Sequence, residues 1–336
     1  MNNPLVTINL VVRNGEKYIR SCLDSVRQQN YENYEVNIFD NASTDKTREI
    51  VKAQYPEFNL IEWKENLGLG KGQERCLEFS RGEFIVALCV DIILDKAFVR
   101  YGVETMLRDE KIGAVQSKMY RFNTDKTEIE KTDFIDSCGF KIFRSRRLIN
   151  IGHGQQDIGQ FNQEKEIFSF EGAAPFFRKK AMESSRIMGE IYDTDLFWYA
   201  TDIDLGWKMR LLGWKSWYNP KMISWHDRPT TKTLKKNNFD FIKSRKEISK
   251  QRRRLSFRNY HLVLIKYDFS KNVIKDFIPF IKRELMLFVY YVMWEPWIFA
   301  EVPAFFKKLS RILKKRKQIM KLTQLKPEEI RWWFLE

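Results

Sequence analysis

The first 120 residues alternate between short apolar runs and amphipathic stretches, and this alternation restricts the fold more than any other feature of the sequence. A short apolar run between polar residues predicts a buried strand, whereas apolar residues every three or four positions predict a helix. Strands and helices that alternate in this way form an α/β fold with a mainly parallel sheet. We expect strands at 6–12, 35–39, 59–63 and 84–90, and helices at 18–28, at 44–54 with Ser43 as the cap, and up to residue 80.

Polar residues follow three of these predicted strands. Arg13 and Asn14 follow the first strand, Asp40 and Asn41 come at the end of the second, and Asp91 follows the last. The carboxyl ends of parallel strands meet at one edge of a sheet, where open α/β folds bind their ligands. We therefore expect these five side chains to line one crevice. Taken alone, the residues after the second strand would favour a simple turn, because Asn, Ser and Asp are all turn formers.

A glycine-rich run from Asn66 to Gly72 precedes the third predicted helix. The run lacks the GK[ST] ending of a P-loop and the GxGxxG spacing of a dinucleotide-binding turn, so it is neither of those phosphate motifs. Lys71 within it is a compact cation suited to phosphate.

The segment 192–226 gathers acidic residues ahead of one histidine. Asp202 lies at the predicted start of an amphipathic helix, where a carboxylate faces free backbone N–H groups. A lone Asp at this place is usually an N-cap, but this one has acidic neighbours, and His226 lies at a strand end, a place suited to chemistry. We expect Asp195, Asp202 and Asp204 around the helix start, a helix end at Gly213, a strand at 215–218, a turn at Asn219 and Pro220, and a second strand up to residue 225.

These blocks together resemble family 2 glycosyltransferases, and especially the bacterial rhamnosyltransferase-like branch. The resemblance covers about residues 5–265 and is strongest over 170–226. It implies a GT-A fold, in which the second acid of the helix-start pair removes the proton of the acceptor hydroxyl, and this role falls on Asp202. Thr201 stands where the family usually has Glu.

The resemblance also implies a donor site and a metal site. The family's D-x-D metal motif is reduced here to Cys89-Val90-Asp91, so Asp91 is its one remaining acid, with His226 and the donor diphosphate completing the shell. Such oxygen-rich ligation suits Mg²⁺ or Mn²⁺. Asp40 matches the aspartate that contacts the nucleotide base. The implied nucleotide-sugar contacts are Arg13, Asn14, Asp40, Asn41, Asn66, Gly68, Lys71 and Asp91, and the implied acceptor side is Gly172, Ala173 and Asp204.

The C-terminal part of the chain differs in charge from the rest. Residues 243–321 contain 21 Lys and Arg against 6 Asp and Glu, which accounts for the whole net charge of +15. The apolar run from Leu285 to Trp294 is too short to span a bilayer. With its basic flanks it predicts contact with an anionic membrane surface, and packing on the catalytic domain or on another subunit is the alternative. We divide the chain into a GT-A-like domain, 1–238, and a basic helical region, 239–336.

Composition also limits which cellular compartment and which functions we expect. Four widely spaced cysteines without C-x-x-C pairs predict reduced thiols in the cytoplasm and no zinc site. The N-terminus is predicted to be a strand and not a signal peptide. We expect an inverting glycosyltransferase that moves a sugar from dTDP-rhamnose or a UDP-sugar to a saccharide or lipid-linked saccharide in cell-surface polysaccharide synthesis. A nucleic-acid-binding protein is an alternative, although the basic residues avoid the predicted catalytic domain. A catalytically inactive scaffold is another, suggested by Thr201 and the reduced metal motif.

Overall fold

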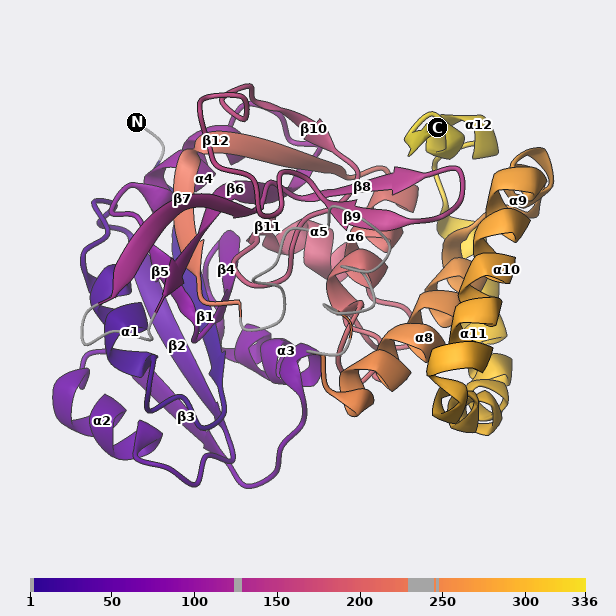
Figure 1. Ribbon diagram of the computed structural model, residues 1–336. Coiled ribbons are helices and arrows are strands. Elements are labelled where there is room, and N and C mark those ends of the chain that lie inside the picture. The colour runs from indigo at the N-terminus through magenta and orange to yellow at the C-terminus, as the bar shows by residue number, and fades with distance from the viewer. Residues whose placement is uncertain (1–2, 124–128, 229–244, 246–247) are drawn as a thin grey trace.

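The computed structural model describes residues 3–123, 129–228, 245 and 248–336 (Figure 1). Its centre is a ten-stranded sheet in the order β10-β12-β6-β11-β4-β1-β2-β3, with β5 and β7 paired to β12 and β6. The neighbours β4, β1, β2 and β3 run parallel, and β11 is antiparallel to both β4 and β6. The strands of this sheet are β1 (Val6–Val12), β2 (Tyr34–Asn41), β3 (Asn59–Trp63), β4 (Phe84–Cys89), β5 (Ile92–Leu94), β6 (Ile112–Asn123), β7 (Glu130–Ser137), β10 (Lys165–Ile167), β11 (Phe176–Arg178) and β12 (Lys215–His226).

Helices cover both faces of the sheet. Alternate residues of β1 belong to opposite cores, since Ile8 and Leu10 pack with α1 and α4, whereas Val11 packs with Phe39 and with Cys76 of α3. This arrangement confirms the predicted α/β fold. The helices of this part are α1 (Ile19–Arg27), α2 (Thr47–Gln54), α3 (Leu69–Phe79), α4 (Phe98–Met106), α5 (Lys179–Ser184) and α6 (Thr201–Leu211).

Two local predictions were wrong. Helix α2 begins at Thr47 and not at residue 44, because the Ser43 hydroxyl accepts a hydrogen bond from the Asn14 backbone N–H at 2.9 Å and does not cap the helix. The predicted turn at Asn219 and Pro220 is an irregularity within the single strand β12, whose register against β6 shifts between Asn219 and Ile223. Proline is accepted in a strand at such a bulge because it has no N–H to donate.

A layer of helices follows the sheet in the chain and packs against α6 (Figure 1). Trp207 and Leu211 of α6 share a core with Leu262 and Tyr267 of α8 and with Ile312 of α11. The predicted domain boundary at residues 238 and 239 lies outside the described residues. The elements of this layer are α8 (Lys250–Tyr267), α9 (Ser270–Lys275), α10 (Phe277–Trp294), the 3₁₀ helix η1 (Pro296–Glu301), α11 (Val302–Leu322) and α12 (Pro327–Arg331).

The C-terminus returns to the sheet-containing part. Strand β13 (Phe334–Leu335) pairs in parallel with β8 (Phe140–Phe143), which also pairs with β9 (Leu148–Asn150) in a second, three-stranded sheet. The helical layer is thus joined to the rest of the protein both by the shared core under α6 and by this strand pairing.

Membrane-spanning potential is limited to one combination of helices. Among the described residues, no single helix is both long and apolar enough to cross a bilayer. Helix α10 and the stretch 296–322 meet that requirement only as a pair, and they are bent by 110° at the break between them.

Candidate active site

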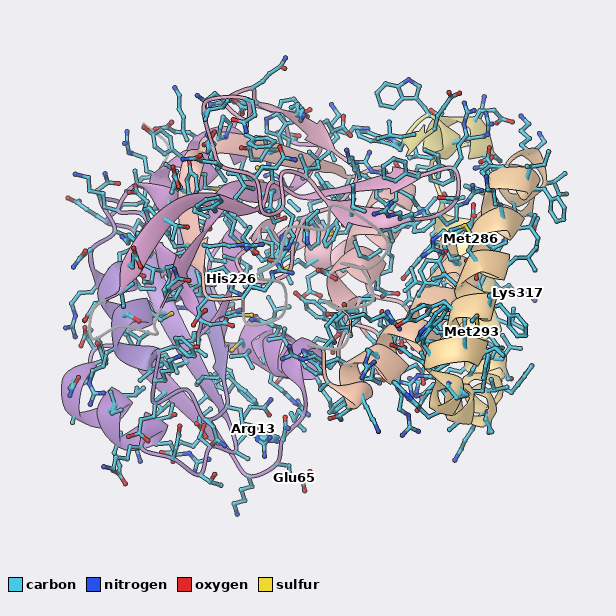
Figure 2. The ribbon with its side chains drawn as sticks, in the orientation of Figure 1. Arg13, Glu65, His226, Met286, Met293 and Lys317 are labelled. Carbon is cyan, nitrogen blue, oxygen red and sulfur yellow. The ribbon has the colours of Figure 1, made fainter. Side chains whose placement is uncertain are left out.

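The strand ends bring the predicted donor residues to one edge of the sheet. In the parallel registers of β1, Val12 lies opposite Asp40, and Val11 lies opposite Cys89. Arg13 therefore follows β1 at the edge where β2 ends, and Asp91 lies two residues beyond β4. Figure 2 labels Arg13, which is exposed, and His226, which lies nearer the middle of the molecule.

Asp40 is wholly buried at this edge. Its Oδ1 accepts hydrogen bonds from the Arg48 guanidinium at 2.5 Å and from the Ser43 backbone N–H at 3.0 Å. Its Oδ2 is buried and has no hydrogen-bond partner among the described residues. A buried acceptor without a partner is costly, so Oδ2 is suited to receive a donor group from a ligand such as a nucleotide base.

Three of the predicted donor contacts build the glycine-rich turn instead of pointing away from it. Asn41 accepts from the Leu67 N–H at 2.7 Å and donates to the Gly68 carbonyl at 3.2 Å. Asn66 accepts from the Gly68 N–H at 3.0 Å. Gly68 has a φ of 78°, and a Cβ there would lie 3.1 Å from the Phe197 carbonyl oxygen. These residues therefore hold the shape of the turn.

Three further polar residues differ in the contacts they make. Lys71 is exposed in the first turn of α3, where its charge is available to a phosphate. Gln73, two residues later, is buried and donates to the Asn9 carbonyl at 3.3 Å. Asn14 accepts from the Thr44 N–H at 2.8 Å and so joins the β1 end to the residues that follow β2.

His226 lies between two carboxylates. Its Nε2 is 3.5 Å from Asp91 Oδ2, and its Nδ1 is 2.9 Å from Asp136 Oδ2. Burial alone would lower the pKa of His226, but the two carboxylates outweigh it and raise that pKa to about 10. For Asp91, whose side chain is 31% exposed, burial raises the pKa but the charge of His226 outweighs it, so the carboxyl pKa is lowered. The pair is thus charged and partly open to solvent.

Asp136 organises a charge network that the sequence did not reveal as a site. Its buried carboxylate contacts Arg228 at 2.9 Å as well as His226, and its backbone carbonyl lies 2.7 Å from Nδ1 of His153. Arg228 also reaches Glu171 at 2.6 Å. His153 is therefore part of the site's support. The spacing of two of its members could have suggested this network. His226 and Arg228 are two residues apart at a strand end and can face the same side.

Asp202 lies in the first turn of α6, next to Gly172, which has no side chain. A Cβ added at Gly172 would be 3.1 Å from Asp202 Cβ and 3.6 Å from its Oδ2. The neighbouring Ala173 carbonyl accepts from the Cys89 N–H at 2.8 Å, which joins this segment to the end of β4. Burial raises the pKa of Asp202 to about 6, and the charge of Glu171 adds to the effect. A carboxylate with this pKa is well matched to accept a proton near neutral pH.

The prediction for Asp204 was wrong. Its carboxylate is buried and ion-pairs with Lys266 of α8, so it does not face the acceptor side. Residues two apart on a helix point to nearly opposite sides, which separates Asp204 from Asp202. Asp195 likewise pairs with Lys315 of α11 at 2.9 Å.

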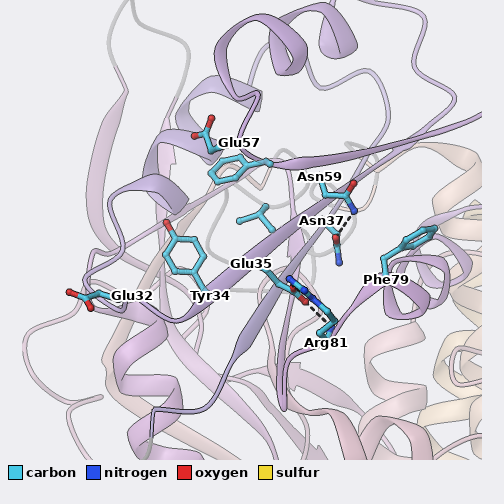
Figure 3. Close-up of a pocket in the computed structure, with 10 residues that line it drawn as sticks. Glu32, Tyr34, Glu35, Asn37, Glu57, Asn59, Phe79 and Arg81 are labelled. Carbon is cyan, nitrogen blue, oxygen red and sulfur yellow. Dashed lines mark hydrogen bonds and ion pairs between the residues drawn. The ribbon is translucent and has the colours of Figure 1, made fainter.

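A pocket of about 580 Å³ lies at the opposite edge of the sheet (Figure 3). Its lining includes Tyr34 and Asn59, which begin β2 and β3, together with Arg81. Strand β2, which ends with Asp40 and Asn41, begins here, so this hollow is separate from the predicted donor site.

Several known proteins resemble this chain in sequence or in fold. The poly-beta-1,6-N-acetyl-D-glucosamine synthase of Staphylococcus aureus (strain COL) is 24% identical over 230 residues, which are 67% of this chain and 50% of the relative. The chain thus spans about half the length of the S. aureus relatives it matches.

Two solved structures share the fold at lower identity. GalNAc-T7, solved with UDP, GalNAc and Mn²⁺, has a TM-score of 0.60 at 13% identity, over 81% of this chain and 49% of that one. S. aureus TarS 1-349 in complex with UDP has a TM-score of 0.51 at 16% identity, over 98% of this chain and 86% of that one. The sequence model described as "Glycosyl transferase family 2" matches residues 7–185. That match spans more than half of the chain and includes both the β1–β4 edge and the Gly172 segment, and the chain therefore belongs to glycosyl transferase family 2.

Proposed function

We propose that the protein is an inverting glycosyltransferase in which Asp202 is the general base. The observation that carries this proposal is the half-buried Asp202 carboxylate beside Gly172, with its pKa raised to about 6. In a single displacement, Asp202 accepts the proton of the acceptor hydroxyl while that oxygen attacks the sugar carbon and the nucleoside diphosphate leaves. General base catalysis of this kind contributes about 10²- to 10⁴-fold.

The donor is a nucleotide sugar bound at the β1–β2–β4 edge. The unpartnered Oδ2 of Asp40 supports a contact to the base, and the exposed Lys71 supports a contact to phosphate. Both fold relatives described above were solved with UDP, which favours a UDP-sugar. The resemblance to the rhamnosyltransferase-like branch makes dTDP-rhamnose the other candidate.

A divalent cation, Mg²⁺ or Mn²⁺, would be held by Asp91 and His226 and would neutralise charge on the leaving diphosphate. The residues present fit such an ion, which would take the place of the Nε2 proton of His226, because a histidine ligates a metal through an unprotonated ring nitrogen. Asp136 holds Nδ1 of His226, which directs Nε2 towards Asp91, and this is the usual carboxylate support of a metal-binding histidine. Over the described part of the chain, no cluster of three or more acidic, His or Cys side chains is arranged to hold a metal alone. The remaining ligands would be diphosphate oxygens and water, as Mg²⁺ commonly requires.

The acceptor is a hydroxyl of a saccharide or lipid-linked saccharide, in the synthesis of a cell-surface polysaccharide. The name of the S. aureus relative supports this class. We place the reaction in the cytoplasm, with the helical layer at the inner face of the membrane.

The test is a screen of nucleotide sugars against the purified protein with Mg²⁺ or Mn²⁺, read first by thermal stabilisation, because a bound donor raises stability by mass action. Donors that stabilise are then assayed for hydrolysis and transfer. Binding without turnover for every stabilising donor would support an inactive scaffold, for which Thr201 and the reduced metal motif are the reasons. Salt-sensitive binding of oligonucleotides without binding of any sugar nucleotide would instead support the nucleic-acid alternative.

A further inference from the structure

The outer face of α10 is apolar and exposed to solvent. Met286, Val289 and Met293 repeat at helical spacing along it, with exposed fractions of 62%, 53% and 63%. Figure 2 labels Met286 and Met293 on this helix, at the side of the molecule away from Arg13. An apolar surface of this extent is unusual on a soluble monomer and marks an interaction site. We call it the α10 apolar face, formed by Ile278, Leu285, Met286, Val289, Val292 and Met293.

Contacts on the other side of α10 fix this orientation. Glu284 lies 3.1 Å from His261 of α8, and Arg283 donates to the Tyr260 hydroxyl at 2.5 Å. Tyr290 and Tyr291 are buried in a core with Ile298. Because polar and aromatic contacts both hold the inner side, α10 cannot turn its apolar face inward without losing them.

Lysines that form no ion pair among the described residues accompany this face. Lys282 lies on the same stripe, between Ile278 and Leu285, and α11 adds exposed lysines. Over 277–322 the sequence has ten Lys and Arg against three Glu. Each of those three carboxylates is ion-paired. Among the described residues, these exposed lysines form no ion pair: Lys282, Lys307, Lys314, Lys317 and Lys321.

We propose that the α10 apolar face and the exposed lysines around it bind an anionic lipid bilayer, with α10 lying in the plane of the interface. Apolar insertion with flanking cations is the composition of an interfacial helix. A second copy of this chain is a poorer partner, since a two-fold contact through this face would bring lysines against lysines. Anionic headgroups offer the complementary charge.

A bilayer bound at this surface would be a partner of the proposed glycosyltransferase. Helix α10 packs on α8, and Asn259 of α8 donates to the carbonyls of Leu196, Trp198 and Tyr199, just before Asp202. A bilayer bound at α10 therefore has a fixed relation to the catalytic segment. Delivery of a lipid-linked acceptor rests on the proposed function, whereas lipid binding itself does not.

The test is sedimentation of the full chain with vesicles, without any sugar nucleotide. The vesicles are pure phosphatidylcholine or an equimolar mixture of phosphatidylcholine and phosphatidylglycerol. The protein should pellet with the anionic vesicles at low salt, pellet less at high salt, and pellet weakly with the neutral ones. Failure to pellet with anionic vesicles at any salt concentration would overturn the proposal.

Variants separate the two parts of the surface. Met286→Ser with Met293→Ser should abolish pelleting while the melting temperature stays unchanged, because both side chains are exposed. Lys314→Gln with Lys317→Gln should weaken anionic binding by about fivefold per charge. The matched control, Ile158→Ser with Met188→Ser, removes exposed apolar side chains from the sheet-containing part and should bind like the wild type.

Two outcomes of these variants contradict the proposal. The first is wild-type pelleting by the Met286→Ser, Met293→Ser variant. The second is a wild-type dimer that this variant converts to monomer while neither protein binds vesicles, which would assign the face to a second copy. Sugar transfer by a protein that does not bind vesicles overturns the membrane proposal alone. Vesicle binding by a protein that turns over no donor overturns the proposed function alone.

Discussion

The two sides of the α6 start hold carboxylates with opposite surroundings. Asp202 faces Gly172, accepts one hydrogen bond from the Ile203 N–H at 2.8 Å, and has its pKa raised to about 6 by burial. Asp204, two residues later, is buried against Lys266, which also pairs with Asp193. The same residue type is thus left able to exchange a proton on one side and is held in a buried ion pair on the other.

This difference teaches what distinguishes a reactive acid from a structural one. On the Asp204 side, lysines from α8 and α11 neutralise the acids, so those charges join the helical layer to the sheet-containing part. On the Asp202 side, the absence of a side chain at Gly172 leaves room near the carboxylate. A position in the first turn of a helix predicts neither role, because the role depends on what packs against that turn.

The largest expected effect is that of Asp202→Asn on transfer. Asn keeps the shape and can still accept from the Ile203 N–H, but it cannot take a proton, so turnover should fall by about 10²- to 10⁴-fold. Donor affinity by calorimetry and the melting temperature should stay near the wild-type values. Near-wild-type turnover would remove Asp202 from the role of base.

The same substitution at Asp204 should act on stability. Asp204→Asn removes one partner of a buried ion pair with Lys266, which typically costs about 3–5 kcal/mol of unfolding free energy. Chemical denaturation measures this loss, and Asp202→Asn is the matched control in the same helical turn. Equal stability of the two variants would refute the contrast between the two sides.

The metal pair should control donor binding. Asp91→Ala, His226→Ala and chelation by EDTA should each weaken binding of the donor diphosphate, because its charge would be poorly compensated. Asp136→Asn, which alters the support of His226, should lower metal affinity by about 10- to 100-fold. Calorimetry measures both quantities, and Arg81→Ala at the opposite edge of the sheet is the control. Donor affinity that is indifferent to EDTA would contradict the metal proposal and transfer the role to Lys71.

The pH profile should report the environment of Asp202. A base with a pKa of about 6 loses activity as the pH falls through that value, by about tenfold for each further unit. Because burial raises this pKa in the folded state, the ionised carboxylate disfavours folding at pH values above it, and this penalty disappears as the pH falls towards the unfolded value. Asp202→Asn should therefore be at least as stable as the wild type at pH 7, with the difference shrinking towards pH 4. Melting curves across this range check the sign.

The sequence predicted those parts of the protein that local pattern determines. The strands Val6–Val12 and Asn59–Trp63 have the expected bounds, because each is a short run closed by polar residues. The shared edge of Asp40 and Asp91 also follows from strand alternation alone. The partners of side chains were not accessible in this way.

Long-range partners explain what the sequence did not predict at the site. Asp204 is buried because Lys266, from a helix much later in the chain, lies against it, and no local pattern contains that contact. Asn41 turns towards Leu67 and Gly68 because the glycine-rich turn folds back on the end of β2. The loop that ends with Ala200 has positive φ angles at Phe197, Tyr199 and Ala200, which its sequence does not suggest.

The smallest expected effect concerns that loop, through which the helical layer would position Asp202. Asn259 of α8 is wholly buried, and its side-chain amide donates to three carbonyls of the strained loop before Asp202. Backbone strain of this kind persists only where neighbouring contacts hold it. Asn259→Ala should cost about 1–3 kcal/mol of stability and lower turnover several-fold. Donor affinity should fall less than turnover, because the loop meets the donor side through Phe197, which lies against Gly68 of the glycine-rich turn. Asn272→Ala is the matched control, because Asn272 is equally buried in the helical layer and donates to the Pro327 carbonyl at 2.7 Å, away from the loop. A comparable stability loss in both variants with a turnover loss only for Asn259→Ala would show that the helical layer positions Asp202, whereas equal turnover in both would limit Asn259 to a purely structural role.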